Sequence, residues 1–277
     1  MTNHPGPRRE VVVNYAILGV FVASTLLPLL GLVNSALGPP GAGTATLTIP
    51  HSLHLGNLTT AWRQGHFSQY MLSSLIVSGG ATILCCTFSL LAGYALGTMT
   101  FRGREVIFYI FLLGIMVPEE AVIVPLYFDL RSLGLTDTYG SLILPQTAGI
   151  LSFGIFWMRA FFKTTSPALR EAAAMDGASS WTILTRILLP ISRPALVTLA
   201  MLTFMWTWNE FLLPLVMIST ESMRTAPLGL SFFRSEYVTQ FSLLSAAALI
   251  VAAPVVVLYL FFNRKFIAGM MSGAIKE

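Results

Sequence analysis

The chain has 277 residues, of which 55% are hydrophobic and only 10% are charged. Soluble domains usually carry about 25% charged residues, so this chain has too few charges to cover a globular surface. The composition therefore predicts an integral membrane protein and excludes an ordinary soluble one. The net charge of +4 comes from 16 basic and 12 acidic residues, and the basic residues form no clustered face of the kind that binds nucleic acid.

Six stretches are apolar over about 20 residues, the length that crosses a bilayer as a helix. They lie at about residues 11–33, 70–97, 106–130, 139–160, 194–217 and 241–262. The first follows Arg8 and Arg9, as a signal peptide would, but it is longer than the roughly 7–15 apolar residues of such a signal. We therefore predict an all-α integral membrane protein with a six-helix transmembrane domain at 11–263, an N-terminal segment 1–10 and a tail 264–277.

The distribution of basic residues predicts the orientation of these spans. If the N-terminus is cytoplasmic, 12 of the 16 basic residues fall in cytoplasmic segments. Because Lys and Arg accumulate in cytoplasmic loops, we expect both termini and the loop 161–193 to be cytoplasmic. The segments 34–69 and 218–240 are then expected to face outward.

The cytoplasmic loop contains the end signals of a short helix. Ser166 can accept a backbone N–H bond as the N-cap, and Pro167 suits the first helical position, where its missing N–H has no helical partner anyway. Gly177 suits the left-handed residue that ends a helix. These signals predict a helix over 167–176.

A second helix is predicted directly after the first, capped by Ser179 or Ser180 and terminated by Pro190. The first helix carries three small residues, 172–174, beside which a partner backbone could approach closely. Because a short isolated helix is marginal in water, this elbow needs packing against its own chain or against a partner. The pattern alone leaves open both an ordinary interfacial loop and a docking site.

The residues Glu171-Ala172-Ala173, Gly177 and Ile187-x-Leu189-Pro190 stand at the spacing of the EAA-loop signature. This loop resembles that of the membrane permease subunits of binding-protein-dependent ABC importers. Further similarity lies at 101–104, Pro118, 125–127, 134–138, 208–211, 214–215 and 269–276. Together these residues resemble the carbohydrate-uptake, maltose-transporter-like permeases, and specifically the second of their two paired membrane subunits.

The resemblance implies a type I ABC importer permease fold in the prokaryotic cytoplasmic (inner) membrane. It implies as partners a second homologous permease, two copies of a cytoplasmic ATP-binding subunit and an extracytoplasmic substrate-binding protein. ATP and Mg²⁺ would bind to the ATPase subunits, and this chain would hold no cofactor. The elbow would dock on the ATPase and couple ATP binding to alternating access. The coupling residues implied by the signature are Glu171, Ala172, Ala173, Asp176, Gly177, Ile187, Leu189 and Pro190.

The sequence contains no motif that predicts an enzyme. It has no GxxxxGK[ST] phosphate loop and neither HExxH nor GxSxG. A stand-alone secondary transporter is the alternative function, but it would need internal symmetry or an ion-coupling site, and neither is visible. His51, His54 and His66 share one outward segment with no acidic residue between them, so we expect no metal site there.

Three acidic residues fall inside predicted spans, where charge is expensive and marks a functional hypothesis. At about 1.5 Å per helical residue, Glu119 lies roughly 20 Å and Glu210 roughly 22 Å from the cytoplasmic edge. We therefore predict that Glu119, Glu120 and Glu210 contribute to one polar translocation pathway, together with Trp208 and Asn209. Helix packing through hydrogen-bonded acids, or an outer gate, is the alternative.

Two further features remain at the level of packing and substrate class. Gly93 and Gly97 form a GxxxG spacing that permits close helix approach, and we interpret it as packing alone. The sequence leaves the substrate open among mono-, di- and oligosaccharides and glycerol phosphates.

Overall fold

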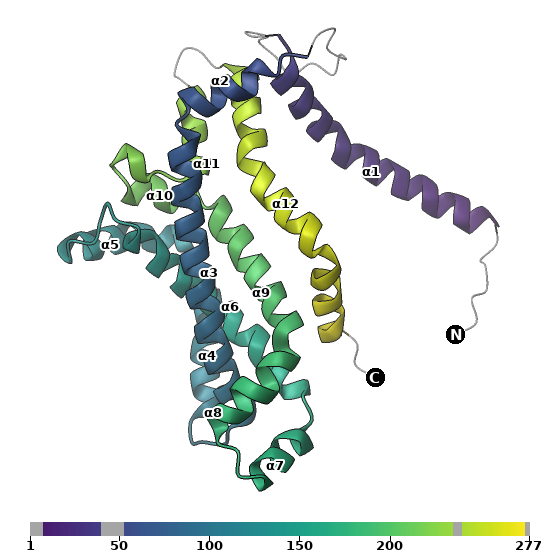
Figure 1. Ribbon diagram of the computed structural model, residues 1–277, viewed down its shortest axis with the longest axis vertical. Coiled ribbons are helices and arrows are strands. Elements are labelled where there is room, and N and C mark those ends of the chain that lie inside the picture. Colours follow the sequence, from purple (N-terminus) through teal and green to yellow (C-terminus); the bar gives the residue numbers. More distant parts are fainter. Residues whose placement is uncertain (1–7, 40–52, 235–239, 275–277) are drawn as a thin grey trace. The chain divides into compact units, whose positions relative to one another are not determined.

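The computed structural model describes residues 8–39, 53–234 and 240–274, with side chains described for 10–39, 53–234 and 240–263. The described residues form helices and no strand (Figure 1), so the all-α prediction is confirmed. The chain divides into two compact units, Met1–Phe67 with Leu230–Ala252, and Ser68–Gly229 with Ala253–Glu277. Five helices are long and apolar enough to cross a membrane, and a bent helix pair would provide a sixth span.

The first unit contains α1 (Arg8–Leu37), α2 (Gly56–Gln64), a short 3-10 turn η3 (Leu230–Phe233) and the beginning of α12 (Phe241–Ala274). The buried amide of Asn57 donates to the carbonyls of Ala36 and Gly38, both at 2.9 Å. Because the last carbonyls of a helix have no partner within it, Asn57 satisfies the end of α1. The apolar side chains of α1 are otherwise largely exposed within this unit.

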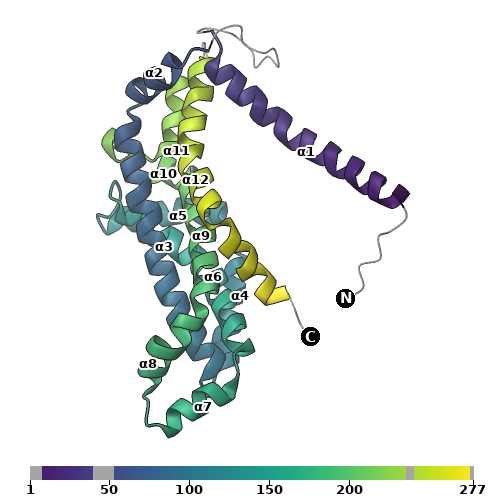
Figure 2. The ribbon, with the colours of Figure 1, turned by 45° about the vertical axis from the view of Figure 1, so that its right-hand side comes forward.

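The second unit is built around α3 (Phe67–Thr98) and α6 (Gly140–Thr164), which approach one another closely. A Cβ at Gly93 would lie 2.6 Å from the Cβ of Met158, and one at Gly97 would lie 3.1 Å from the Cβ of Phe162. The GxxxG spacing therefore marks helix packing, as predicted. Helices α4 (Arg104–Ile115) and α9 (Leu189–Asn209) also pack against α6, and α3, α6 and α9 run alongside one another in both views (Figures 1 and 2).

The predicted third span at about residues 106–130 is present as a bent pair of helices rather than as one continuous helix. Helix α4 ends at Ile115, and α5 (Glu119–Ser132) leaves at an angle of 97°. Pro118 stands at the break in an extended conformation, with ψ 129°. Proline lacks an N–H and disfavours the helical conformation of the residue before it, which explains why the apolar run breaks there.

The predicted fifth span is also interrupted near its C-terminal end. Helix α9 ends at Asn209, Glu210 is extended with ψ 128°, and α10 (Leu212–Met217) follows. Helix α10 packs against α5 and α6. The remaining short elements are α7 (Pro167–Met175), α8 (Ser180–Thr182), the π-helical turn η1 (Ile183–Leu188), the 3-10 turn η2 (Glu221–Met223) and α11 (Ala226–Gly229).

The last helix extends further than the sequence indicated. The sixth span was predicted to end at about residue 262, with a separate tail from 264. Helix α12 instead continues to Ala274, well beyond Asn263, where its apolar spanning stretch ends.

Replacing Gly93 by Ala should destabilise the protein by about 1–3 kcal/mol, because the new methyl group would overpack the contact with Met158. The matched control is Gly79→Ala on the same helix, where nothing lies within 4 Å of the new Cβ. That control should be neutral or stabilising, because Ala favours a helix over Gly by about 1 kcal/mol. Thermal unfolding in detergent measures both variants, and equal shifts would contradict the close-packing interpretation.

Candidate functional site

Helix α7 forms the first half of the elbow, and its C-terminal end has the geometry that the sequence predicted. Gly177 has a φ of +80°, its N–H donates to the carbonyl of Ala174, and the next N–H, of Ala178, donates to Ala173, both at 3.0 Å. This pair of bonds is the Schellman motif, in which the left-handed residue is usually Gly. A side chain at position 177 would therefore strain the turn that ends α7.

The N-terminal end of α7 differs in one detail from the prediction. Pro167 is the first helical residue and Ser166 occupies the N-cap position, but the Ser166 side chain makes no capping hydrogen bond. Because Pro has no N–H, one of the usual unsatisfied donors is already absent from this first turn.

The second half of the elbow is continuous with a membrane-spanning helix. Ser179 caps it by accepting the N–H of Thr182 at 3.2 Å, which decides between the two predicted caps. Pro190 does not terminate this helix, contrary to prediction, because α8, η1 and α9 follow one another without a break. A wider π-helical turn directly before Pro190 accommodates a residue that would otherwise clash with the carbonyl four positions back. The elbow can therefore move together with α9.

The signature residues divide between a buried and an exposed face. Ala173 is buried in an apolar cluster with Phe162 and Leu188, and Ile187 packs against that cluster. Leu189 is half-buried, whereas the other signature residues are exposed. These exposed residues are Glu171, Ala172, Asp176, Gly177 and Pro190. The short helix is thus held by its own chain on one face and is free on the other.

The sequence analysis missed a large apolar residue on this exposed face. Met175 is 88% exposed at the end of α7, and Leu169 and Trp181 are 40% and 64% exposed nearby in the chain. Exposed apolar groups around polar ones are typical of a protein interface. An apolar residue directly before the helix-ending Asp176 was the available signal.

The structure brings together two of the three predicted acidic residues. Glu119 begins α5 at one helix break, Glu210 stands at the other, and α10, which follows Glu210, packs against α5. The depth calculated for Glu119 assumed a continuous helix and does not hold, because α4 ends at Ile115. What relates the two acidic sites is the packing of α10 on α5, not an equal depth along two continuous helices. Glu119 and its neighbour Glu120 are both exposed.

Glu210 has a definite local role as well as a charge. Its Oε1 accepts the backbone N–H of Leu213 at 3.0 Å, so it satisfies a donor at the start of α10. Of its neighbours, Asn209 is exposed and donates to the carbonyl of Met205 at 2.7 Å. Trp208 is 1% exposed and stacks on Phe204 at 5.5 Å, so its ring belongs to the core of this chain.

Asp137 joins the turn before α6 to the segment that follows α10. Its Oδ1 accepts the backbone N–H groups of Ser219 and Thr220, each at 2.9 Å, and its Oδ2 accepts the Thr220 hydroxyl at 2.6 Å. These hydrogen bonds, first the one from the Thr220 hydroxyl, hold the pKa of Asp137 below its usual value. The segment 134–138 resembles the permease family in sequence, and this contact gives it a structural role.

No group of three potential metal ligands occurs among the described residues. His54 and His66 lie among those residues, whereas His51 lies outside them. The site therefore comprises the elbow at one end of the second unit and the acidic residues at its two helix breaks.

Comparison with known proteins identifies the family. Residues 88–266 match the sequence model of a protein family, the binding-protein-dependent transport system inner membrane component. These residues include the elbow and both helix breaks. The chain belongs to this family. It is therefore a permease component of a binding-protein-dependent ABC importer rather than the ATPase, and it is a multi-pass membrane protein.

Curated relatives match this permease along nearly its whole length. The probable ABC transporter permease protein YurM of Bacillus subtilis is 36% identical over 98% of this chain and 91% of its own length. The trehalose transport system permease protein SugB of Mycobacterium tuberculosis is 31% identical, over 98% and 99% of the two chains. The diacetylchitobiose uptake system permease protein NgcG of Streptomyces coelicolor is 31% identical, over 96% and 88%.

Solved structures show the same fold. A chain of a bacterial ABC transporter involved in the import of the acidic polysaccharide alginate superimposes with a TM-score of 0.81 at 21% identity. The match covers 96% of this permease and 99% of that chain. The expected ABC importer permease fold is therefore confirmed.

Replacing Asp137 by Asn should lower the stability of the permease at neutral pH. It should also make that stability fall less as the pH is lowered. Because the folded state holds the pKa of Asp137 low, the stabilisation is present above the unfolded pKa of about 3.9 and is lost as the pH falls through the lower folded pKa. The difference in unfolding midpoint between wild type and Asp137→Asn should thus shrink as the pH falls below about 4.

The control for this titration is Asp129→Asn, whose exposed side chain accepts no hydrogen bond in the described part of the chain. It should show no such pH dependence. A difference between wild type and Asp137→Asn that stays constant down to a pH of about 3 would show that the carboxylate makes no charge-dependent contribution.

Proposed function

We propose that this permease is one of two homologous membrane subunits of an ATP-driven importer that carries a carbohydrate or related solute inward. The related permeases named above serve trehalose and diacetylchitobiose transport, and another relative, 31% identical, is the arabinooligosaccharides permease AraQ of Halalkalibacterium halodurans. These names favour a di- or oligosaccharide. A substrate-binding protein on the outer side would deliver it.

The observation that carries the proposal is the two-faced elbow helix α7. One face is anchored by Ala173 in the core of the second unit, while Glu171, Ala172 and Met175 are free on the other. A nine-residue helix is too short to be stable alone, so this anchoring prepares it for a partner. We assign that partner as the cytoplasmic ATPase, which binds ATP and Mg²⁺, while this chain itself holds no cofactor.

The orientation and the mechanism follow from this assignment. Docking on an ATPase places α7 and both termini in the cytoplasm, in agreement with the excess of basic residues in the segments on that side. ATP binding would draw two ATPases together and move the docked helices with them. Since η1 joins α7's neighbour α8 to α9 without a break, the displacement would reach a spanning helix directly and drive alternating access.

The two helix breaks are the proposed place of solute passage. Exposed backbone is tolerated at membrane depth where protein or water satisfies it, and Glu119, Glu120, Asn209 and Glu210 make this region polar. Carboxylate and amide groups suit the hydroxyls of a sugar. The buried ring of Trp208 would support Asn209 from behind rather than contact the solute.

Replacing Met175 by Ala should reduce co-purification of the ATPase subunits with the permease. An exposed anchor at the centre of an interface typically contributes 2 kcal/mol or more, so we expect roughly tenfold weaker binding or more. The control is Met116→Ala, because Met116 is 77% exposed but lies at the break between α4 and α5. Equal binding of wild type and both variants would exclude Met175 from the docking surface.

Replacing Glu210 by Gln tests the pathway role separately from the capping role. Gln keeps an oxygen that can accept the N–H of Leu213 but removes the charge, whereas Ala removes both. A pathway role predicts that Glu210→Gln assembles normally but loses about tenfold in uptake of labelled saccharide, the effect of one lost charge-assisted hydrogen bond.

The uptake assay uses the complete transporter in proteoliposomes with ATP. Normal uptake by Glu210→Gln together with unfolding of Glu210→Ala would make Glu210 a structural acid. Failure of the wild-type transporter to take up any mono-, di- or oligosaccharide, despite normal ATP hydrolysis, would contradict the carbohydrate assignment.

A further inference from the structure

The C-terminal end of α3 is held by arginines from three different helices. The last carbonyls of a helix have no partner within it and carry its negative dipole end, so they attract cationic donors. The three contacts run from Arg159 Nε to Leu96 O at 3.1 Å, from Arg170 Nη1 to Thr98 O at 2.9 Å, and from Arg104 Nη1 to Met99 O at 3.0 Å. We call this group, Arg104, Arg159 and Arg170 on the carbonyls of residues 96, 98 and 99, the three-arginine cap.

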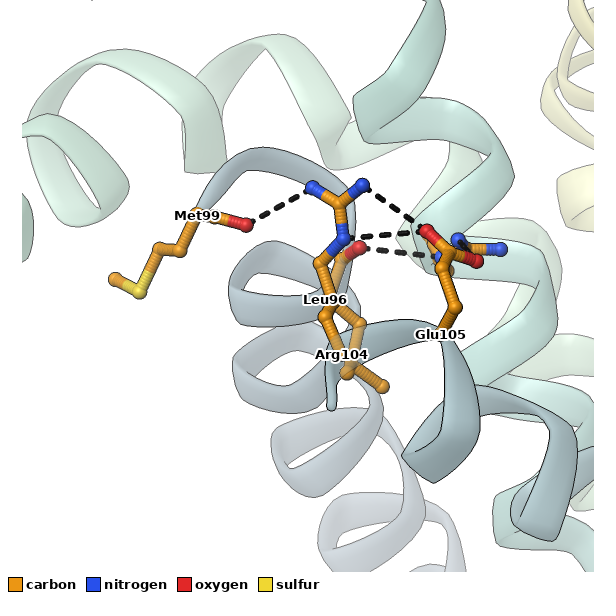
Figure 3. A network of polar contacts seen from close by, with 5 residues as sticks. Leu96, Met99, Arg104 and Glu105 are labelled. Carbon is orange, nitrogen blue, oxygen red and sulfur yellow. Dashed lines mark hydrogen bonds and ion pairs between the residues drawn. The ribbon is translucent and has the colours of Figure 1, made fainter. Parts of the chain in front are cut away.

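Glu105 joins two of these arginines into one network (Figure 3). Its Oε1 accepts from Arg104 Nε and Nη2 at 3.2 and 3.0 Å, and its Oε2 accepts from Arg159 Nη2. Arg159 is only 6% exposed, and its guanidinium lies 3.6 Å above the ring of Phe108. Because charge-assisted hydrogen bonds are stronger than neutral ones, these contacts of the exposed Glu105 with Arg104 and the buried Arg159 link α3, α4 and α6 to one another.

Arg170 is the member of the cap that belongs to the elbow helix α7. Its Nη1 donates to the carbonyl of Thr98, whereas Nε of the same guanidinium is buried without a partner in the described part of the chain. Helix α7 is also held by apolar contacts, because Ala173 lies in a cluster with residues of α3, α6, η1 and α9. Apolar contacts are non-directional, whereas a hydrogen bond constrains distance and angle.

We propose that the three-arginine cap transmits displacement of α7 to α3, α4 and α6, and that Arg170 is the positioning residue for this transfer. The elbow is joined to the membrane helices by its backbone, through residues 165–166 to α6 and through η1 to α9, and by the apolar cluster around Ala173. The Arg170 bond adds a directional connection to the end of α3. With these connections, α3, α4, α6 and α9 follow α7 as one body. The inference rests on the proposed docking of α7 to an ATPase.

The test uses the complete transporter in proteoliposomes, with Arg170→Gln, Arg170→Lys and the control Arg193→Gln, which removes an exposed arginine from α9. Arg170→Gln should assemble with the ATPase and hydrolyse ATP as wild type does, because Arg170 points toward its own chain. It should transport at least about fivefold less solute per ATP hydrolysed, the lower end of usual coupling between sites. Arg170→Lys, which keeps a cationic donor, should recover part of this ratio, and Arg193→Gln should match wild type.

A structural readout measures the rigid connection itself. Spin labels at Ala168 on α7 and at Thr100 after α3, both exposed, should keep one distance in the resting and ATP-trapped states of wild type. In Arg170→Gln that distance should change between the states or broaden.

The outcomes separate the inference from the function on which it rests. If the wild-type permease does not bind an ATPase, the proposed function fails. If wild type couples normally, and Arg170→Gln keeps the wild-type transport per ATP or loses only assembled complex, the three-arginine cap has no role in coupling.

Discussion

Inside a bilayer no water is available to the backbone, so each peptide group must find its partner within the protein. Continuous helices meet this condition by themselves, but backbone groups at the ends of helices need other partners. At several of them a polar side chain supplies the partner: Glu210 accepts the N–H of Leu213, Asp137 accepts N–H groups of the segment after α10, and Asn57 donates to the carbonyls at the end of α1. The three-arginine cap does the same for α3. Breaks in the helices are thus possible where such a side chain is present.

The second unit combines one tightly fixed region with the two ends to which we assign the function. The glycines of α3 let it lie directly against α6, and such close-packed helices resist deformation. At one end α7 exposes Met175 and Glu171, and at the other α5, which begins at Glu119, packs against α10, which follows Glu210. If α7 is the energy input and the helix breaks form the pathway, as we propose, a rigid element between them would pass on the displacement that alternating access requires.

The predictions from sequence succeeded where the deciding forces act over a few residues. The extent of α7 follows from Pro167 and Gly177, whose backbone preferences are intrinsic, and the structure places its ends within one residue of the prediction. The predictions failed where apolarity was taken to mean continuity. Hydropathy reports how a segment is solvated but not whether it is straight, so Pro118 indicated a break in the apolar run but the 97° bend came only from the structure. The prediction for Pro190 was wrong in the opposite sense, because a π-helical turn before it lets the helix continue.

The sequence by itself determined that this is a helical membrane protein with a capped elbow, and the elbow signature indicated the family. These properties depend on composition, on local end signals and on residues at fixed spacing. The tertiary fold was needed to show that Met175 is on the exposed face of α7, that α5 packs against α10, and that Arg159 and Arg170 both donate to carbonyls of α3. The last two contacts join residues 63 and 72 positions apart. Such pairs depend on how helices cross, and no local pattern in the chain specifies which distant carbonyl a guanidinium will meet.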